Sequence, residues 1–469
     1  MRSAPTVLAA LFVGFSGADD GELRAVERGE TSPPIVWKPP ATFSEKAPGL
    51  GLPTLEGVAH WLIYDPLPSK ANVDEGGDGR LESLRHGTFN HHQEIVLHEG
   101  KFIVFWTNHS RDENGPGQRV LAKAGTFNAE RTEVAWGGDE TLVELAPAPV
   151  PVRRRKYDSD PEVIREVKAS AALRRINGRL YVLGSLNAWH GRTDDVKYHG
   201  TYGKPIPAER WSDRYDRAKG FQWDIAWPLG LKFAQRWKVE GGRLVPDSPF
   251  YKMSEPVAKV EVTPGRFKRV EALIEPYASA RPFSEAPAEM QEDVLRGQPE
   301  RFSRNPKYAP GTSKLAADGK NGLAHHTEFR RPDGRWVAVR DNLVNPNYYY
   351  AALKEKPEDN YPPAVRTNLL GHAMPVAGEL ADGRVWLICN DRPRRHMYLT
   401  LSDDGITFDK TWLLLRIERE TDGGLHKGGG PQYFQAVTVG PNIWVVYSVG
   451  KEQIGATRVP AARLSSDAR

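Results

Sequence analysis

The chain has 469 residues, and its 64 Lys and Arg against 60 Asp and Glu give a net charge of +4. This near-balanced charge argues against bulk nucleic-acid binding, and the contents of glycine (44), proline (37) and tryptophan (13) argue against a helical bundle or coiled coil. The single cysteine, Cys389, excludes an internal disulfide and every multi-cysteine metal motif. We therefore expect a fold of many short strands.

The N-terminal segment has the layout of a secretory signal peptide. Arg2 precedes a short apolar stretch, and the small residues Ser16 and Ala18 come directly before two aspartates. A short core helix is the alternative. We expect a signal peptide over residues 1–18, a proline-rich leader over 19–50 and a single domain over 51–462, in a secreted or periplasmic protein. No later segment approaches the ~20 apolar residues of a membrane span, so we predict none.

A turn followed by an apolar strand recurs along the chain. Clear copies lie at 99–105, 177–183, 333–339 and 382–388, and degenerate ones at 241–245 and 440–447. Most clear copies carry an Asn-Gly or Asp-Gly pair, which a tight hairpin favours because these residues tolerate positive φ. The run after each turn is almost wholly apolar, which predicts a central strand buried on both faces.

Hairpins repeated at irregular intervals predict stacked antiparallel sheets, and radial repetition of such sheets makes a β-propeller. We predict an all-β fold, a β-propeller of seven blades with long loop insertions. Six blades are the alternative count, and a β-sandwich is the competing fold. The insertion at about 255–320 includes a predicted short helix over residues 286–296. The segment 402–408 resembles the Asp-box (BNR) turn of sialidase-type propellers, in which Asp and Ser/Thr side chains bind the hairpin backbone.

Polar residues recur at a fixed distance from the turn glycines. His91 lies nine residues before Gly100, and His325 lies nine before Gly334. The residues in or near register are His91, His92, His325, His326 and His372 before the turns, and Asn108 and Asn342 after them. Because the first strand of each blade lines a propeller channel, we expect these side chains to meet at one mouth and form a small-molecule or sugar site. The alternative is that the histidines cap strands.

The spacing of these histidines does not indicate a metal site. Neither an HxH nor an HExxH pattern supports zinc, and no Asp-rich loop indicates calcium. We therefore expect that no cofactor is required, with structural Ca or Zn not indicated.

Three segments resemble the propeller polysaccharide lyases, which include the ulvan lyases and the rhamnose–glucuronate lyases. They are 89–121, which opens with Phe-Asn-His-His-Gln-Glu, then 399–415 and 445–454. The wider sialidase-like propellers share part of this pattern. The resemblance implies cleavage of a glycosidic bond at C4 of a uronic acid by β-elimination.

The resemblance also implies a His and an Arg around the substrate carboxylate, with a Tyr or a second His moving protons. The catalytic residues that it implies are His91, His92, His109, Tyr157 and Arg174. Arginine provides a bidentate, permanently charged clamp, and a nearby cation lowers the pKa of a tyrosine. Arg174 and Arg175 lie in an alternating stretch, so one of them should point into the channel. The expected substrate-binding residues are Asn108, Arg175, Trp189, His325, His326, Asn342 and His372.

We therefore expect a monomeric polysaccharide lyase that acts on an acidic polysaccharide or oligosaccharide. An exo-glycosidase of sialidase or rhamnosidase type is the first alternative, since Glu94 and Glu328 lie in register as candidate acids. The Arg-Ile-Pro signature of sialidases is absent, because Asn177 follows Arg175-Ile176. The second alternative is a non-catalytic glycan-binding propeller, in which the tyrosine run 348–350 would stack on sugars.

Overall fold

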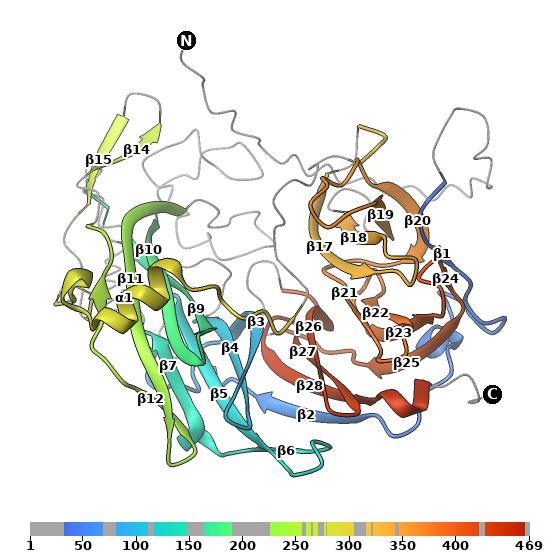
Figure 1. Ribbon diagram of the computed structural model, residues 1–469, viewed down its shortest axis with the longest axis horizontal. Coiled ribbons are helices and arrows are strands. Elements are labelled where there is room, and N and C mark those ends of the chain that lie inside the picture. The colour runs from blue at the N-terminus through green and yellow to red at the C-terminus, as the bar shows by residue number, and fades with distance from the viewer. Residues whose placement is uncertain are drawn as a thin grey trace.

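The computed structural model describes residues 32–68, 81–110, 117–147, 163–164, 166–189, 226–255, 259–263, 266–270, 276–277, 279–303, 316–319, 322–342, 347–421 and 427–464. Strands dominate these residues, and five antiparallel sheets follow one another around the molecule (Figure 1). The predicted all-β propeller is confirmed. We name its five sheets of four or more strands blades A to E in chain order.

In blades A to D the strands follow one another in sequence with the first strand at one edge, and in blade E the N-terminal strand β2 follows β26, β27 and β28. Blade A contains β3 (Phe89–His98), β4 (Lys101–His109), β5 (Arg119–Phe127), β6 (Val134–Trp136) and β7 (Leu142–Ala146). Blade B contains β9 (Glu166–Ile176), β10 (Arg179–Trp189), β11 (Ala226–Glu240), β12 (Arg243–Pro246), β13 (Tyr251–Lys252) and β16 (Arg281–Pro282). Blade C contains β17 (Leu323–Arg330), β18 (Trp336–Asn342), β19 (Tyr348–Lys354) and β20 (Val365–Leu370).

Blade D contains β21 (Val376–Glu379), β22 (Val385–Asn390), β23 (His396–Ser402) and β25 (Lys410–Arg416). Blade E contains β26 (Pro431–Val439), β27 (Asn442–Val449), β28 (Gln453–Pro460) and β2 (Ala59–Tyr64). Two smaller sheets join β14 (Lys259–Thr263), β15 (Arg266–Val270) and β8 (Val163–Ile164), and β1 (Val36–Trp37) with β24 (Thr407–Phe408). The expected number of seven blades therefore stays a prediction.

The described helices are short. They are the 3-10 turns Pro48–Gly51, Asp139–Thr141, Phe283–Glu285 and Ala461–Leu464, and α1 (Ala288–Arg296). The prediction of a helix over 286–296 is confirmed. Among the described residues, no helix has the length and apolar character that a membrane crossing requires.

The recurring turn joins the first and second strands of each blade. At 99–100 and 177–178, both turn residues have positive φ, with Glu99 at 47° and Gly100 at 73°. The strand after the turn is the second of its sheet, and every residue of β22 and β27 is buried. The sequence pattern thus correctly predicted the hairpins and the buried second strands, but the copy at 241–245 instead joins β11 to β12, and β12 is mostly exposed.

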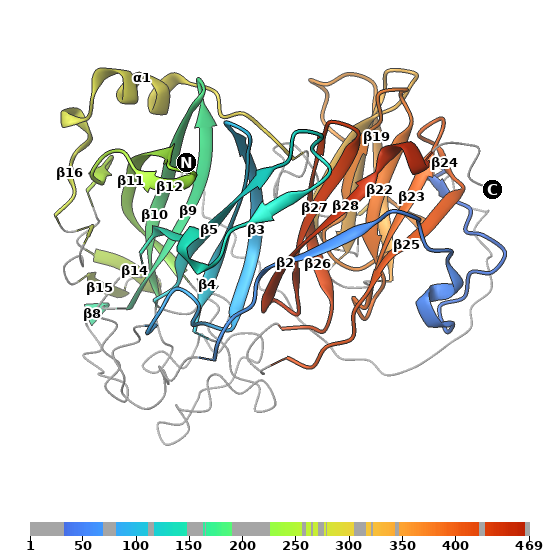
Figure 2. The ribbon, with the colours of Figure 1, turned by 90° about the horizontal axis from the view of Figure 1, so that it is seen from below.

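Apolar side chains between neighbouring blades form the core. Separate clusters pack blade A on blade B, blade E on blade A, blade D on blade E, and blade C on blade D. The first strands β9, β3, β26, β21 and β17 contact one another in this order (Figure 2 shows the sheets from the side). The N-terminal ends of β3, β17 and β26 lie at the same end of the sheets, since His91 and His325 both contact Tyr433.

An N-terminal strand completes the C-terminal blade. β2 pairs antiparallel with β28 from Ala59↔Arg458 to Tyr64↔Ile454. This pairing ties the two ends of the chain together and covers the edge of blade E, which is how a propeller protects its strand edges.

Part of the expected leader belongs to the packed domain. β1 pairs in parallel with β24, and Ile35 and Trp37 are buried in the core between blades C and D. The indole Nε1 of Trp37 donates a hydrogen bond to Thr411 Oγ1 over 3.0 Å. Residues 1–31, which include the expected signal peptide, lie outside the described residues.

The turn at 402–408 has the hydrogen bonds expected of an Asp-box. Asp404 Oδ1 accepts from the backbone amides of Ile406 and Thr407, and from the hydroxyl of Ser402. The Ser402 hydroxyl in turn accepts from the Gly405 amide. The segment therefore stabilises a hairpin, and its acid is a structural residue.

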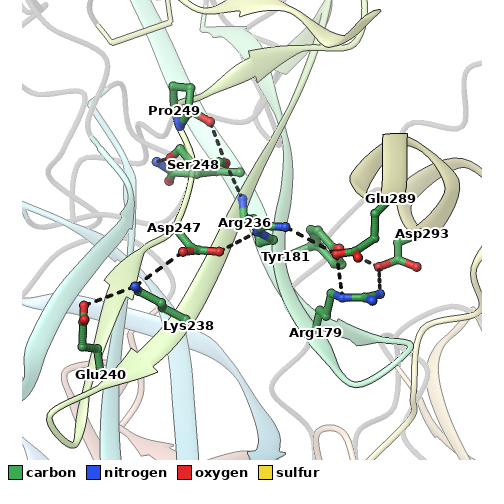
Figure 3. Close-up of polar contacts among 11 residues, drawn as sticks. Arg179, Tyr181, Arg236, Lys238, Glu240, Asp247, Ser248, Pro249, Glu289 and Asp293 are labelled. Atoms are coloured by element: carbon green, nitrogen blue, oxygen red, sulfur yellow. Dashed lines mark hydrogen bonds and ion pairs between the residues drawn. The ribbon is translucent and has the colours of Figure 1, made fainter. Parts of the chain in front are cut away.

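Helix α1 is fixed to blade B by a buried carboxylate, Asp293 (Figure 3). Asp293 accepts hydrogen bonds from Tyr181 Oη at 2.6 Å, Arg179 Nη1 at 2.8 Å and Asn177 Nδ2 at 2.8 Å. Burial alone would raise the pKa of Asp293, but these three hydrogen bonds lower it below its usual value. Nearby, Glu289 of α1 pairs with Arg179 and Arg236 at the surface.

Replacing Asp293 by alanine is expected to destabilise the protein by about 3 kcal/mol, since it leaves the buried Tyr181 hydroxyl without its acceptor and removes one of the two acids that pair with Arg179. Glu292→Ala removes an exposed pair with Arg296 on the same helix and is expected to cost less than about 0.5 kcal/mol. Urea unfolding measures both variants, and hydrogen exchange of 288–296 reports whether α1 detaches. Equal losses in the two variants would contradict this role for Asp293.

Candidate functional site

The ends of three inner strands are distorted at the same level of the propeller. β3 has a register shift between His91 and Glu94, β17 between Leu323 and His326, and β26 between Gln432 and Gln435. Such bulges re-aim side chains that a regular strand would point elsewhere. Here the side chains come from blades A, C and E.

The side chains at these bulges meet around one tyrosine, Tyr433. Its ring centroid lies 4.1 Å from that of His91, 5.0 Å from that of His325 and 5.8 Å from that of His92. Lys451 Nζ lies 5.8 Å from the same ring, on the turn between β27 and β28. His91 is fully buried, with Nδ1 2.8 Å from Ser448 Oγ, whereas His92 and Tyr433 are half-buried.

Blade D contributes a second layer of polar contacts. Arg394 Nη2 lies 2.9 Å from His372 Nε2, and its Nη1 donates to Gln432 Oε1. Gln93 Nε2 donates to the backbone carbonyl of Tyr433. We call His91, His92, His325, His372, Arg394, Tyr433 and Lys451 the axial cluster.

Unusual backbone conformations concentrate in this cluster. Of the nine non-glycine residues with positive φ in the described part of the chain, four belong to it and a fifth, Ala373, follows His372. The four are His92 at 58°, Arg394 at 57°, Tyr433 at 59° and Lys451 at 60°. Each such residue costs about 1 kcal/mol or more, and proteins retain this strain mainly at functional sites. The backbone therefore supports the axial cluster as the functional site.

Asp341 orients one histidine of the cluster. Its Oδ1 accepts from the His325 backbone amide at 2.6 Å, and its Oδ2 lies 2.9 Å from His325 Nδ1. Burial alone would raise the pKa of Asp341, but the contacts with His325 and the nearby Arg394 outweigh burial. They lower the pKa of Asp341 below its usual value and keep the carboxylate ionised. Because an ionised carboxylate only accepts, Nδ1 of His325 carries a hydrogen that it donates to Asp341.

Two further histidines, His372 in the axial cluster and His326 next to His325, are neutral near pH 7. Burial, with Arg394 nearby, lowers the pKa of His372 to about 3, so that its Nε2 accepts from Arg394. Burial, with Arg340 nearby, lowers the pKa of His326 to about 4. Of the charges named near the cluster, the cations Arg340, Arg392, Arg394 and Lys451 outnumber the acids Asp341 and Asp391, so the site favours an anion.

His326 should make the fold acid-sensitive. The folded protein resists its protonation, so the unfolded chain binds more protons below pH 6.5, and stability is lost as the pH falls from 6.5 towards 4. Neither ring nitrogen has a hydrogen-bond partner among the described residues. When the pH is lowered from 7 to 4.5, the free energy of unfolding of His326→Phe should therefore fall by about 2 kcal/mol less than that of the wild type, as measured by urea unfolding. Identical losses in both proteins would contradict this.

Several residues expected at the site have structural contacts instead. Asn108 donates to Asn90 Oδ1 at 2.8 Å and accepts from Arg119 Nε at 2.7 Å, within a buried network in blade A. Asn342 hydrogen-bonds Tyr350. His109 is buried at the end of β4, with Nε2 3.4 Å from Ser110 Oγ. The expected roles of these three residues stay predictions.

The two arginines of β9 diverge. Arg174 Nη1 donates to Glu94 Oε2 at 2.6 Å, which links the inner strand β9 of blade B to the inner strand β3 of blade A. Glu94 lies three residues after His91 of the axial cluster. Arg175 Nη1 instead donates to the Leu97 carbonyl near the far end of β3, and its Nε lies 3.2 Å from Glu300. Tyr157 and the side chain of Trp189, the last residue of β10, lie outside the described residues.

The sequence pattern groups His91, His92 and His325, whose rings the structure places around Tyr433, but it does not indicate Tyr433, Arg394 or Lys451. A signal for Tyr433 exists, since it lies seven residues before Gly440 of the degenerate turn, close to the eight that separate His92 from Gly100. Because that turn lacks an Asp-Gly or Asn-Gly pair, the sequence pattern only weakly indicates which residues before it are in register with His91 and His92. Nothing in the local sequence indicates Arg394 or Lys451, which lie on loops.

No group of three or more His, Cys, Asp or Glu in the described ranges is arranged to hold a metal ion. The expectation that no cofactor is required stays a prediction.

No protein-family model matches the sequence, and no curated protein matches it. A solved sialidase is similar in structure, with a TM-score of 0.54 and 16% identity over 91% of this chain and 35% of its own. The chain thus spans about a third of the length of that sialidase.

Two further solved structures are similar at lower scores. A Trypanosoma rangeli sialidase in complex with sialic acid has a TM-score of 0.39 and 10% identity, covering 88% of this chain and 60% of its own. The Fusarium graminearum α-L-arabinofuranosidase with arabinobiose has a TM-score of 0.35 and 10% identity, covering 86% and 98%. The sialidase with a TM-score of 0.54 confirms the sialidase-like propeller as a fold, and the resemblance to polysaccharide lyases stays a prediction.

Proposed function

We propose that this protein is a carbohydrate-active enzyme that cleaves an acidic glycan at the axial cluster by β-elimination next to a uronate. The observation that carries the proposal is the placement of Tyr433 within 4.1 to 5.8 Å of the rings of His91, His325 and His92 and of the Lys451 ammonium. Elimination needs a base at C5, an acid at the leaving oxygen and cations at the carboxylate. The cluster supplies these groups.

The residues take the following roles. Arg394 and Lys451 bind the uronate carboxylate and stabilise the negative charge that develops when the C5–H bond breaks. His325, held by Asp341, accepts the phenolic proton of Tyr433, and the phenolate takes the proton from C5. The C4–O bond then breaks, a C4–C5 double bond forms, and the imidazolium returns its proton to the leaving oxygen. Protons balance over the cycle.

Hydrolysis is the second candidate, and the carboxylate of Glu94 favours it. Glu94 lies on β3 three residues after His91 and is 36% exposed, so a hydrolase could use it as an acid. Its Oε2 lies 2.6 Å from Arg174 Nη1. Glu328, the other acid in register, instead accepts from Tyr361 Oη at 3.1 Å.

One assay separates these reactions. The protein is incubated with uronate-containing polysaccharides, and new reducing ends are counted together with the ultraviolet absorbance of the unsaturated uronate. Elimination gives both signals in equal amounts, and hydrolysis gives reducing ends alone. Binding of these glycans with neither signal would identify a non-catalytic propeller. The proposal of elimination fails if reducing ends appear without absorbance.

A further inference from the structure

A cavity lies at the opposite end of the inner strands from the axial cluster. Its volume is about 360 Å³, and its walls come from the end of β3, the following turn, the end of β5 and Arg175 of β9. His91 and His98 are seven residues apart on β3, which corresponds to about 23 Å along a strand. We call this cavity the turn-side pocket, and it is separate from the axial cluster.

Cations dominate the walls of the turn-side pocket. Lys101, Arg131 and Arg175 line it, and Glu99 is the one acid among the lining residues. Lys101 Nζ donates to Thr126 Oγ1 at 2.6 Å, and Arg175 contacts the Leu97 carbonyl and Glu300. No ion pair of Arg131 is found within the described part of the chain, and its backbone has a positive φ of 57°. The pocket therefore presents positive charge to an entering group.

A buried histidine with an unsatisfied nitrogen faces this pocket. His98 is 7% exposed and lines the cavity, and its Nδ1 has no hydrogen-bond partner among the residues described. Its Nε2 lies 3.7 Å from Glu99 Oε1, which is beyond hydrogen-bond distance. Burial lowers the pKa of His98, so the ring is neutral at pH 7. A buried unsatisfied nitrogen in a cavity wall is what a ligand hydroxyl would satisfy.

The remaining wall suits a sugar ring. Phe127, Leu97 and Val439 line the cavity, and Phe127 is held by edge contact with Trp444 at 5.5 Å between ring centroids. A fixed aromatic face packs against the C–H groups of a sugar while charged residues bind its acidic group. A volume of about 360 Å³ lies in the range of small-molecule sites.

We propose that the turn-side pocket is an accessory binding site for one acidic sugar unit of a glycan. Arg131 and Arg175 bind the carboxylate or sulfate group of the sugar, His98 bonds a ring hydroxyl, and Phe127 packs against the ring. The site anchors a polymer at the end of the propeller opposite the axial cluster, and its binding does not depend on the reaction at that cluster.

The test titrates the full chain carrying Tyr433→Phe, which prevents turnover, with three trisaccharides by calorimetry. These are a uronate trisaccharide, a sulfated trisaccharide and a neutral one of the same size. We expect a second binding event for at least one acidic probe and none for the neutral probe. Binding of the uronate identifies a carboxylate site, and binding of the sulfated probe alone identifies a sulfate ester site.

Variants then locate the event. Arg131→Asn, which keeps a residue that tolerates positive φ, should weaken the second event about tenfold or more, and Arg175→Gln should do the same. Arg296→Gln, on the exposed face of α1, is the matched control and should leave it unchanged. Melting temperatures confirm folding. The inference is overturned if no probe shows a second event, if the neutral probe binds equally, or if Arg131→Asn has no effect.

The outcome is distinguishable from that of the proposed function. Arg394→Gln should weaken the event at the axial cluster by about tenfold to a hundredfold and leave the event at the turn-side pocket unchanged. Loss of both events in Arg394→Gln would place all binding at the axial cluster and overturn the accessory site.

Discussion

Replacing Tyr433 by phenylalanine is expected to reduce turnover of an acidic glycan by at least about 100-fold, because the variant keeps the ring but loses the group that exchanges protons with the substrate. The ring packing against His91 and His325 stays, so the melting temperature and the affinity for substrate should change little. Steady-state kinetics should show the loss in kcat, with KM nearly unchanged.

Two other tyrosines make this test specific. Tyr348→Phe removes a hydroxyl from a half-buried tyrosine that packs against Arg366 in blade C, and it should retain wild-type activity. Tyr157→Phe tests the tyrosine that the resemblance to the lyases implies. Full activity in Tyr433→Phe together with inactivity in Tyr157→Phe would assign proton transfer to Tyr157 and overturn our assignment.

Replacing Arg394 by glutamine is expected to raise KM for an acidic glycan by about tenfold to a hundredfold, since a charge-assisted hydrogen bond contributes roughly 1.5–3 kcal/mol. The wild-type KM should also rise with salt, as a charged contact is screened, and this dependence should weaken in the variant. Isothermal binding in the Tyr433→Phe background measures the same loss without turnover.

The neighbouring arginine is the matched control. Arg395 lies on the same loop but is exposed, with Nη1 3.9 Å from Glu418, and Arg395→Gln should behave as the wild type. Arg394→Lys should recover only part of the affinity, because lysine keeps the charge but not the planar pair of donors to His372 and Gln432. Equal effects of Arg394→Gln and Arg395→Gln would show that general surface charge, and not the axial cluster, attracts the substrate.

The strain in the cluster connects its geometry to these predictions. His92 and Tyr433 hold left-handed backbone conformations next to bulges in β3 and β26, which a regular sheet would avoid. Packing between blades A and E compensates this cost and fixes the side chains before any ligand arrives. A site prepared in this way needs little reorganisation during a reaction, which is the main source of electrostatic stabilisation in enzymes.

Local sequence was sufficient for the hairpins and for part of the site. The Asn-Gly and Asp-Gly pairs marked the turns, and the apolar runs marked the second strands, because both depend on residues close in sequence. Alignment on the turn glycines grouped His91, His92 and His325. It also grouped Asn108 with them, although the structure places Asn108 in a hydrogen-bond network with Asn90 and Arg119. Register gives the level of a residue on its strand, but not the face on which a bulge leaves it.

The repeating hairpin, the all-β class and the recurrence of histidines at one level of the first strands follow from the sequence alone. Only the tertiary structure decided that Tyr433, Arg394 and Lys451 join these histidines, and that Arg174 and Arg175 point to different places. Contacts within a strand or turn depend on local backbone preferences, whereas contacts between blades join residues far apart in sequence, such as His91 and Ser448, which are 357 positions apart. Those contacts depend on how the blades pack against one another, which no local pattern encodes.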